Sequence, residues 1–373
     1  MRRRIRSSVR RPRTALLAGL ALTIAAAGCG WVTITGLEKG GAVQLTSAPA
    51  QAKPPPAPPA PAELQARLTE LAEDYREDVG IAVTDVTERW TASVDGGSLY
   101  PQQSVVKIWV ALAMMEAIDQ GRFRLDQPVL VRPEDRSVFY EPLGRKIGRT
   151  GFLTTYYDLL SRSLTESDNT ANDKIMSEVG GAAIVTDVVA RKGLTGIGIG
   201  GDEKMLQSLT AGVEWRPELV GWRFKEARAK LPDEVRDRAL DAYLANPPDG
   251  ATPIGLTHGL AALQRGELLS KPSTDTLIGL MAEAKTGNLR LKAGLPPGWS
   301  IAHKTGTGPD WRGASVGIND VGLITAPDGR VYAVAVMLRE TKRPFRDRQR
   351  LMQQVARAVA DHWQQRGGGA APV

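Results

Sequence analysis

The sequence predicts an α/β protein of the α+β type: a five-stranded antiparallel sheet, flanked by N- and C-terminal helices, with an inserted all-helical domain. Two observations lead to this prediction. Segments with strand character lie near both ends of the folded region. The middle, about residues 102–295, has helical periodicity with Gly and Pro punctuation. A sheet built from both ends leaves the helical middle as an insertion between its strands.

The start of the chain is predicted to be a leader. Residues 1–29 have an Arg-rich beginning, an apolar run from Ala15 to Ala27 and small residues before Cys29, which is the layout of a signal peptide. Cys29 lies in "AAAGCG", similar to a bacterial lipoprotein processing site, and ordinary cleavage after the "AAA" of 25–27 is the alternative. We therefore expect export to the periplasm, with membrane contact only if Cys29 carries a lipid anchor.

Residues 30–61 are predicted to be a linker, because they end in the proline-dense "APAQAKPPPAPPAPAE". The net charge of +7 does not indicate nucleic-acid binding, because the leader contains seven arginines and no acidic residue. The remainder has 41 of the 48 basic residues and all 41 acidic ones, so it is formally neutral.

The catalytic domain is predicted over residues 62–373. It begins with an amphipathic helix, "ELQARLTELAEDYRED", and a β-hairpin, "VGIAVTDVTERWTASVDGG". Three later segments have strand character: "WSIAHKTGTG", "GASVGINDVGLIT" and "RVYAVAVML". The turn "APDG" joins the last two, and "RDRQRLMQQVARAVADHWQQ" is predicted to form the closing helix.

Ser104 and Lys107 are the first candidate catalytic pair. They lie three residues apart at the start of an apolar helical segment, so they share one face. A serine hydroxyl needs a base to become a nucleophile, and a lysine desolvated by apolar neighbours can serve as that base. The helix N-terminus also favours a developing oxyanion.

Ser-x-x-Lys alone is common and does not indicate catalysis, but two further motifs make the pattern specific. "SDN" occurs at Ser167 to Asn169, and "KTG" occurs at Lys304 to Gly306 on a predicted strand. Each tripeptide by itself is usually a turn, a cap or a strand end. The three motifs in this order resemble the class A serine β-lactamases and the related penicillin-binding proteins. The resemblance extends through nearly all of the predicted folded region.

The resemblance implies a serine hydrolase that forms an acyl-enzyme. Ser104 would be acylated by the β-lactam carbonyl, Lys107 would help to deprotonate it, and Ser167 would relay a proton to the departing ring nitrogen. The backbone N–H groups of Ser104 and Thr307 would form the oxyanion hole.

The remaining motif residues would bind the substrate. Asn169 would hold the side-chain amide, and Lys304, Thr305 and Thr307, in the element that includes Gly306, would bind the carboxylate. The partners implied are β-lactam antibiotics or peptides ending in D-Ala-D-Ala.

The family's deacylating glutamate is matched best by Glu203, with Gln207 four residues later. A competing alignment on "EWRPELV" would place Arg216 at that position, with Glu214 and Glu218 as flanking options. We therefore predict Glu203 as the fourth catalytic residue.

Two departures from the family pattern concern this glutamate. Asn172 comes one position early, and Asp173 stands where the family has a supporting asparagine, so two carboxylates would lie close together and one pKa would rise. Residues 208–250 make the loop region longer than usual and have helical character.

The sequence leaves three functions open: a β-lactamase, a D,D-peptidase or transpeptidase acting on peptidoglycan, and a penicillin-binding sensor that is acylated without turnover. No cofactor and no metal are expected, because the three histidines (His258, His303, His362) lack ligand spacing and there is no glycine-rich phosphate loop. We expect a monomer.

Overall fold

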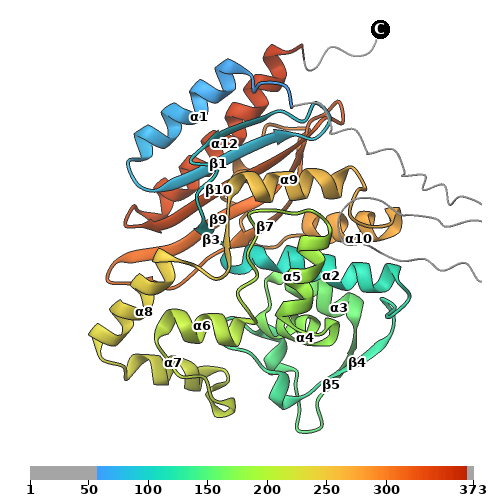
Figure 1. Ribbon diagram of the computed structural model, residues 1–373, viewed down its shortest axis with the longest axis vertical. Helices are drawn as coiled ribbons and strands as arrows, with labels where there is room; N and C mark the ends of the chain where they lie inside the picture. Colours follow the sequence, from blue (N-terminus) through green and yellow to red (C-terminus); the bar gives the residue numbers. More distant parts are fainter. Residues whose placement is uncertain (1–56, 368–373) are drawn as a thin grey trace, which may run out of the picture. The chain divides into compact units, whose positions relative to one another are not determined.

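The computed structural model describes residues 57–367 (Figure 1). The signal peptide predicted for residues 1–29, the lipidation site Cys29 and most of the linker over 30–61 lie outside the described residues. The described residues, 57–367, belong to one compact unit. In the described part of the chain, no helix has the length and apolar character needed to cross a membrane.

The sheet is assembled from both ends of this unit, as predicted. Its five main strands follow the order β2-β1-β10-β9-β7, and every neighbouring pair is antiparallel. Their bounds are β1 (Val79–Asp85), β2 (Thr91–Val94), β7 (Ser300–Gly306), β9 (Ala314–Thr325) and β10 (Val331–Thr341). A two-residue strand, β8 (Asp310–Trp311), adds to the end of β9.

Helices cover both faces of the sheet (Figure 1). Alternate residues of β10 point to opposite faces, so Val334 and Val336 join one apolar core while Ala333 and Ala335 join the other. The first core contains side chains from α1 (Ala62–Tyr75) and α12 (Phe345–Gln365). The second contains side chains from α9 (Pro253–Gln264) and from the helical domain.

The helical domain is built around α2 (Lys107–Asp119), which is buried along almost its whole length. Its other helices are α3 (Tyr156–Ser161), α4 (Asn169–Val179), α5 (Ala182–Arg191), α6 (Glu203–Ala211) and α10 (Lys271–Ala282). The short α11 (Leu291–Gly294) leads from this domain back to the sheet and contacts α12.

The region predicted as mainly helical also contains three short strands, and a fourth directly precedes it. β4 (Pro128–Val131) pairs with β5 (Phe152–Thr155), and β3 (Tyr100–Pro101) pairs with β6 (Gly250–Ala251). Segments of two to four residues are too short to show the strand period, which explains why the sequence did not reveal them.

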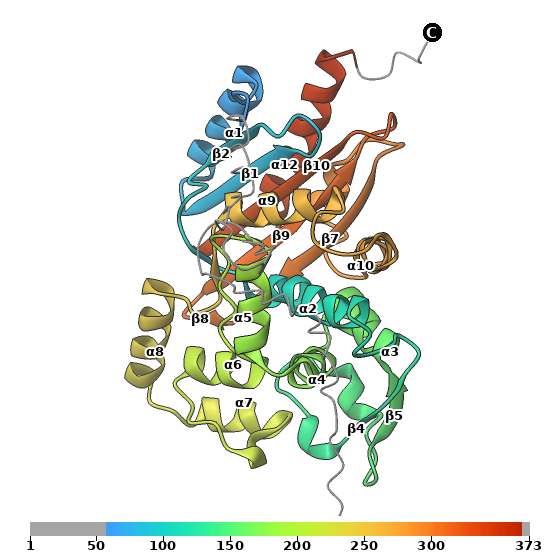
Figure 2. The same ribbon diagram turned by 45° about the vertical axis from the view of Figure 1, so that its right-hand side comes forward.

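Residues 208–250 are helical, as their sequence predicts. They contain the end of α6, then α7 (Trp222–Ala229) and α8 (Asp233–Ala245). Figure 2 shows α6, α7 and α8 together at one side of the helical domain, with α8 close to β8. The indole N–H of Trp311 in β8 donates to Asp237 of α8 at 2.7 Å, which ties this insertion to the sheet.

Candidate active site

Ser104 lies in a single 3₁₀ turn, Gln103–Val106, that leads directly into α2. The backbone N–H of Lys107 donates to the Ser104 carbonyl, so the turn and the helix are continuous. Ser104 lines a cavity of about 610 Å³ between the helical domain and the end of β7. The cavity is also lined by Ser167, Asn169, Glu203, Thr305 and Thr307, so most of the predicted site residues share one space.

Lys107 is fully buried, and its ammonium is surrounded by oxygen atoms. Nζ donates to Asn169 Oδ1 at 2.5 Å and to the Ser167 carbonyl at 2.9 Å, and it lies 3.4 Å from Ser167 Oγ. Glu203 Oε1 completes the set at 3.3 Å. Among the described residues, 57–367, the Lys107 ammonium makes no direct hydrogen bond to Ser104 Oγ. These oxygen atoms replace the water molecules that the ammonium loses when it is buried.

The "SDN" element closes one wall of the cavity. Ser167 ends a π-helical turn, Arg162–Glu166, with a left-handed φ of 64°. Asp168 caps α4 by accepting the Ala171 N–H at 2.8 Å, and this cap fixes Asn169 as the first residue of the helix. Asn169 also donates from Nδ2 to the Val138 carbonyl at 2.9 Å, so its Oδ1 faces Lys107.

The "KTG" element forms the opposite wall, on the edge strand β7. Lys304 Nζ donates to Ser167 Oγ at 2.8 Å and to the Thr305 carbonyl at 2.9 Å. Burial, together with the nearby Lys107, lowers the pKa of Lys304 well below its ordinary value. Ser167 Oγ therefore lies between two buried lysines, a position suited to passing a proton.

Gly306 allows β7 to approach the turn that carries the nucleophile. A Cβ atom at this position would collide with the Gln102 carbonyl and would lie 2.9 Å from Asn319 Nδ2. Asn319 Nδ2 donates to the carbonyls of Pro101 and Gln102 at 2.7 and 3.0 Å, so it fastens this segment to β9.

Arg290 is a site residue that none of the sequence motifs predicts. It lines the cavity and is 7% exposed, and Nη1 donates to the carbonyls of Gly306 and Asn319 at 2.9 and 2.6 Å. Nη2 donates to Thr307 Oγ1 at 2.7 Å. The only available signal was its place at the start of "RLKAGLPPGW", just before β7. Arg290 brings a third cation to the end of the cavity where Lys304 and Thr305 lie.

Of the three candidate glutamates, Glu203, Glu214 and Glu218, Glu203 is the one that lines the cavity. It is the first residue of α6, is 3% exposed, and accepts from Gln207 Nε2 at 3.2 Å through Oε2. Glu214 and Glu218 are both exposed. Glu214 pairs with Arg216 at 3.3 Å on the surface of the insertion. The four-residue offset between Glu203 and Gln207 therefore corresponds to a real contact across one helical turn.

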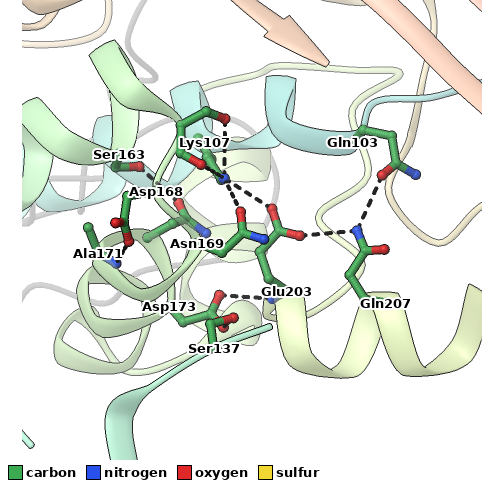
Figure 3. A network of polar contacts seen from close by, with 12 residues as sticks. Gln103, Lys107, Ser137, Ser163, Asp168, Asn169, Ala171, Asp173, Glu203 and Gln207 are labelled. Carbon is green, nitrogen blue, oxygen red and sulfur yellow. Dashed lines mark hydrogen bonds and ion pairs between the residues drawn. The ribbon is translucent and has the colours of Figure 1, made fainter. Parts of the chain in front are cut away.

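Figure 3 shows how Glu203 is held between two neighbours, with Lys107 on one side and Gln207 on the other. Its backbone N–H donates to Asp173 Oδ1 at 2.8 Å. Burial and the nearby Asp202 and Glu203 raise the pKa of Asp173 to about 7, in the direction the sequence predicted for two close carboxylates.

The described residues, 57–367, contain no group of three or more His, Cys, Asp or Glu side chains that could hold a metal ion. His303 on β7 donates from Nδ1 to Asp320 Oδ1 on β9 at 2.7 Å, and both side chains are buried. His258 and His362 lie elsewhere, on α9 and α12.

The combination of this fold with a serine, two buried lysines and a carboxylate around one cavity defines the class, a serine hydrolase of the β-lactamase fold. Residues 63–363 match the model of the β-lactamase enzyme family. The chain belongs to the class A β-lactamase family.

Two relatives with low sequence identity support this assignment. β-Lactamase VEB-1 of Pseudomonas aeruginosa is 26% identical over 286 residues, which cover 76% of this chain and 85% of that protein. The extended-spectrum β-lactamase PER-1 of the same organism is 25% identical over 297 residues, 79% of this chain and 86% of that protein.

Solved structures show the same fold. A β-lactamase from Chitinophaga pinensis DSM 2588 has a TM-score of 0.66 at 26% identity, covering 80% of this chain and 98% of that one. The structure of PBP-A has a TM-score of 0.62 at 24% identity, covering 83% and 99%, a likeness that shows the fold alone.

Proposed function

We propose that this protein is a serine β-lactamase that hydrolyses the β-lactam ring through an acyl-enzyme on Ser104. The observation that carries the proposal is Glu203: a buried carboxylate on the wall of the Ser104 cavity, 3.3 Å from Lys107 Nζ. A carboxylate in this place can activate a water molecule against an ester of Ser104.

In the acylation step, Ser104 Oγ attacks the lactam carbonyl carbon while Lys107 helps to take the hydroxyl proton. The C–O bond forms and the C–N bond breaks, and the ring nitrogen receives a proton through Ser167. The contacts of Ser167 Oγ with Lys304 and Lys107, at 2.8 and 3.4 Å, support this relay. Backbone N–H groups of Ser104 and Thr307 would bind the oxyanion.

In the deacylation step, Glu203 takes a proton from water, and the resulting hydroxide adds to the ester carbonyl. The bond to Ser104 Oγ then breaks, and Oγ regains a proton from Glu203, so one water molecule is consumed for each ring opened. Lys107 and Gln207 would orient the two oxygens of Glu203 for this step.

The cations at the far end of the cavity suit the carboxylate that β-lactams carry. Lys304, Thr305 and Thr307 would bind it, and Arg290 would add positive charge through its contact with Thr307. Asn169 would accept or donate to the amide of the substrate side chain. No step requires a cofactor.

The alternative functions share acylation but differ afterwards. A D,D-peptidase acting on D-Ala-D-Ala ends, or a sensor that is acylated once, does not require fast hydrolysis of a penicilloyl ester. Glu203 favours hydrolysis because its carboxylate lies on the lining of the Ser104 cavity, where it can act as a general base on a water molecule.

The proposal can be tested with a chromogenic cephalosporin. We expect steady hydrolysis by the wild-type protein, and we expect deacylation to fall about 10²–10⁴-fold in Glu203→Gln, with acylated protein accumulating. Glu214→Gln, an exposed glutamate of the insertion, is the matched control and should keep full activity. Acylation of the wild type followed by a stall would contradict the proposal and favour the sensor.

We also propose, from the leader sequence alone, that the protein is exported and acts in the periplasm. Mass spectrometry of the mature N-terminus would distinguish lipidated Cys29 from ordinary cleavage, and retention of an intact leader would contradict export.

A further inference from the structure

The insertion over residues 208–250 contributes a side chain that reaches the back of the active site. Tyr243 of α8 is 1% exposed, although most of α8 is not buried. Its hydroxyl accepts from Gln103 Nε2 at 2.6 Å and donates to Asp249 Oδ1 at 2.8 Å. Tyr243 therefore links the insertion to the residue that directly precedes Ser104.

Asp249 closes these contacts into a ring. Its second oxygen, Oδ2, accepts the backbone N–H of Gln103 at 2.8 Å. The carboxyl group is fully buried, and the donors it meets here are an amide and a phenol, both neutral. Burial raises the pKa of Asp249 to about 6, and the hydrogen bonds from Tyr243 and from the Gln103 backbone oppose this shift.

Gln103 has a conformation that needs such support. Its φ is +51°, a left-handed value that costs on the order of 1–3 kcal/mol for a residue other than glycine. Because Gln103 immediately precedes Ser104, the ring with Tyr243 and Asp249 holds the backbone that presents the nucleophile.

The side chain of Gln103 extends the contact toward Glu203. Gln103 Oε1 accepts from Gln207 Nε2 at 3.3 Å, and the same Nε2 lies 3.2 Å from Glu203 Oε2 (Figure 3). Gln103 can accept from Gln207 only while its Nε2 is directed at Tyr243. The hydroxyl of Tyr243 thus fixes which way this amide points.

We propose that Tyr243 is a positioning residue for deacylation, acting through Gln103 and Gln207 on the orientation of Glu203. The inference rests on the proposed hydrolysis. Without the hydroxyl, the Gln103 amide is free to turn over and present its NH₂ group to the NH₂ group of Gln207. Gln207 then loses one of its two acceptors, and the amide group that donates to Glu203 is no longer fixed in orientation.

The test compares Tyr243→Phe with Tyr156→Phe by pre-steady-state kinetics on a chromogenic cephalosporin. Tyr156 is the matched control because its buried hydroxyl also donates to a carboxylate, that of Glu178, at 2.7 Å, and it does not line the active-site cavity. For Tyr243→Phe we expect deacylation to fall roughly 10-fold, acylation to change less than about 3-fold, and Tyr156→Phe to change neither.

A second comparison separates positioning from a structural effect. In a Glu203→Gln background, Tyr243→Phe should cause no further loss of deacylation, because the group it positions is already gone. If Tyr243→Phe does not fold, Gln103→Met removes the next link and should give the same selective loss.

Equal loss of acylation and deacylation, additive effects with Glu203→Gln, or unchanged deacylation in folded Tyr243→Phe would each overturn the inference. A wild-type protein that does not hydrolyse the substrate would instead overturn the proposed function.

Discussion

Asp173 and Glu203 lie side by side in the buried wall of the active site, joined by the Glu203 N–H that donates to Asp173 Oδ1 at 2.8 Å. The other oxygen of Asp173 accepts from the Ser137 hydroxyl at 2.7 Å. Each of the two acidic side chains is 3% exposed. Asp173 thus supports the backbone of Glu203, but its charge also opposes the charge of Glu203.

Asp173→Asn should stabilise the protein at neutral and alkaline pH. Burial raises the pKa of Asp173 from 3.8 to about 7, so the folded protein binds this proton more tightly than the unfolded chain does. Binding of this proton therefore stabilises the fold fully below about pH 4, and this stabilisation is lost as the pH rises toward 7. An asparagine can keep both hydrogen bonds without the charge.

Urea denaturation near pH 5 and near pH 8 measures this effect. The advantage of Asp173→Asn should grow with pH and reach the order of a few kcal/mol, since one unit of pKa shift corresponds to about 1.4 kcal/mol. Asp241→Asn, at an exposed position of α8, is the control. An advantage that does not change with pH would disprove this account.

Lys304→Met should lower the activity and raise the stability of the protein. Burial lowers the pKa of Lys304, so the charged ammonium destabilises the fold. This destabilisation is small above the ordinary pKa of lysine and increases as the pH falls toward the lowered pKa of the folded state. We expect kcat/KM to fall at least about 10²-fold and the free energy of unfolding to rise by ~1–2 kcal/mol at about pH 7, with a smaller gain near pH 10. Thermal melts at the two pH values, with steady-state kinetics, measure both. A variant less stable than the wild type at both pH values would show that the desolvation argument is wrong.

Arg290→Gln should weaken substrate binding more than it slows the chemistry. Arg290 holds the Gly306 and Asn319 carbonyls and the Thr307 hydroxyl at the carboxylate end of the cavity. We expect KM to rise about 10-fold with a smaller change in kcat, as for loss of one charge-assisted contact. Arg312→Gln is the control, because Arg312 is 57% exposed and pairs with Asp237 at 2.7 Å. A normal KM in folded Arg290→Gln would exclude this role.

Gly306→Ala and Gly279→Ala should have opposite effects on stability. A methyl group at Gly306 collides with the Gln102 carbonyl, whereas at Gly279 in α10 it meets nothing within 4 Å. We expect a loss of about 1–3 kcal/mol and slower acylation for Gly306→Ala, and a gain of ~0.5–1 kcal/mol with normal activity for Gly279→Ala. Chemical denaturation and burst kinetics measure both. Normal acylation by Gly306→Ala would show that β7 need not approach the nucleophile turn so closely.

Much of the fold could be predicted from the sequence, because the spacing of apolar residues that distinguishes helices from strands is visible within each short segment. The segment "RVYAVAVML" predicts a strand, and the structure confirms it as β10, with Val334 and Ala335 in different cores. The site motifs could be found because each is short and continuous. Their meeting at one cavity followed only from the family resemblance.

The missed residues depend on contacts that no local pattern records. Gln103 and Tyr243 are 140 positions apart, and Gln103 and Asp249 are 146 apart. Arg290 has no motif of its own and gains its place from three contacts with β7, β9 and Thr307. Such tertiary partners follow from packing, which the residue spacing does not specify.

We expect Ser104 to be acylated and Glu203 to release the acyl group. Intact-protein mass spectrometry with benzylpenicillin, followed by peptide mapping, measures both steps. We predict a transient adduct of one penicilloyl group on the wild type, a persistent adduct on Ser104 in Glu203→Gln, and none in Ser104→Ala. Hydrolysis by Ser104→Ala at the wild-type rate, or an adduct that maps to another residue, would show that Ser104 is not the nucleophile.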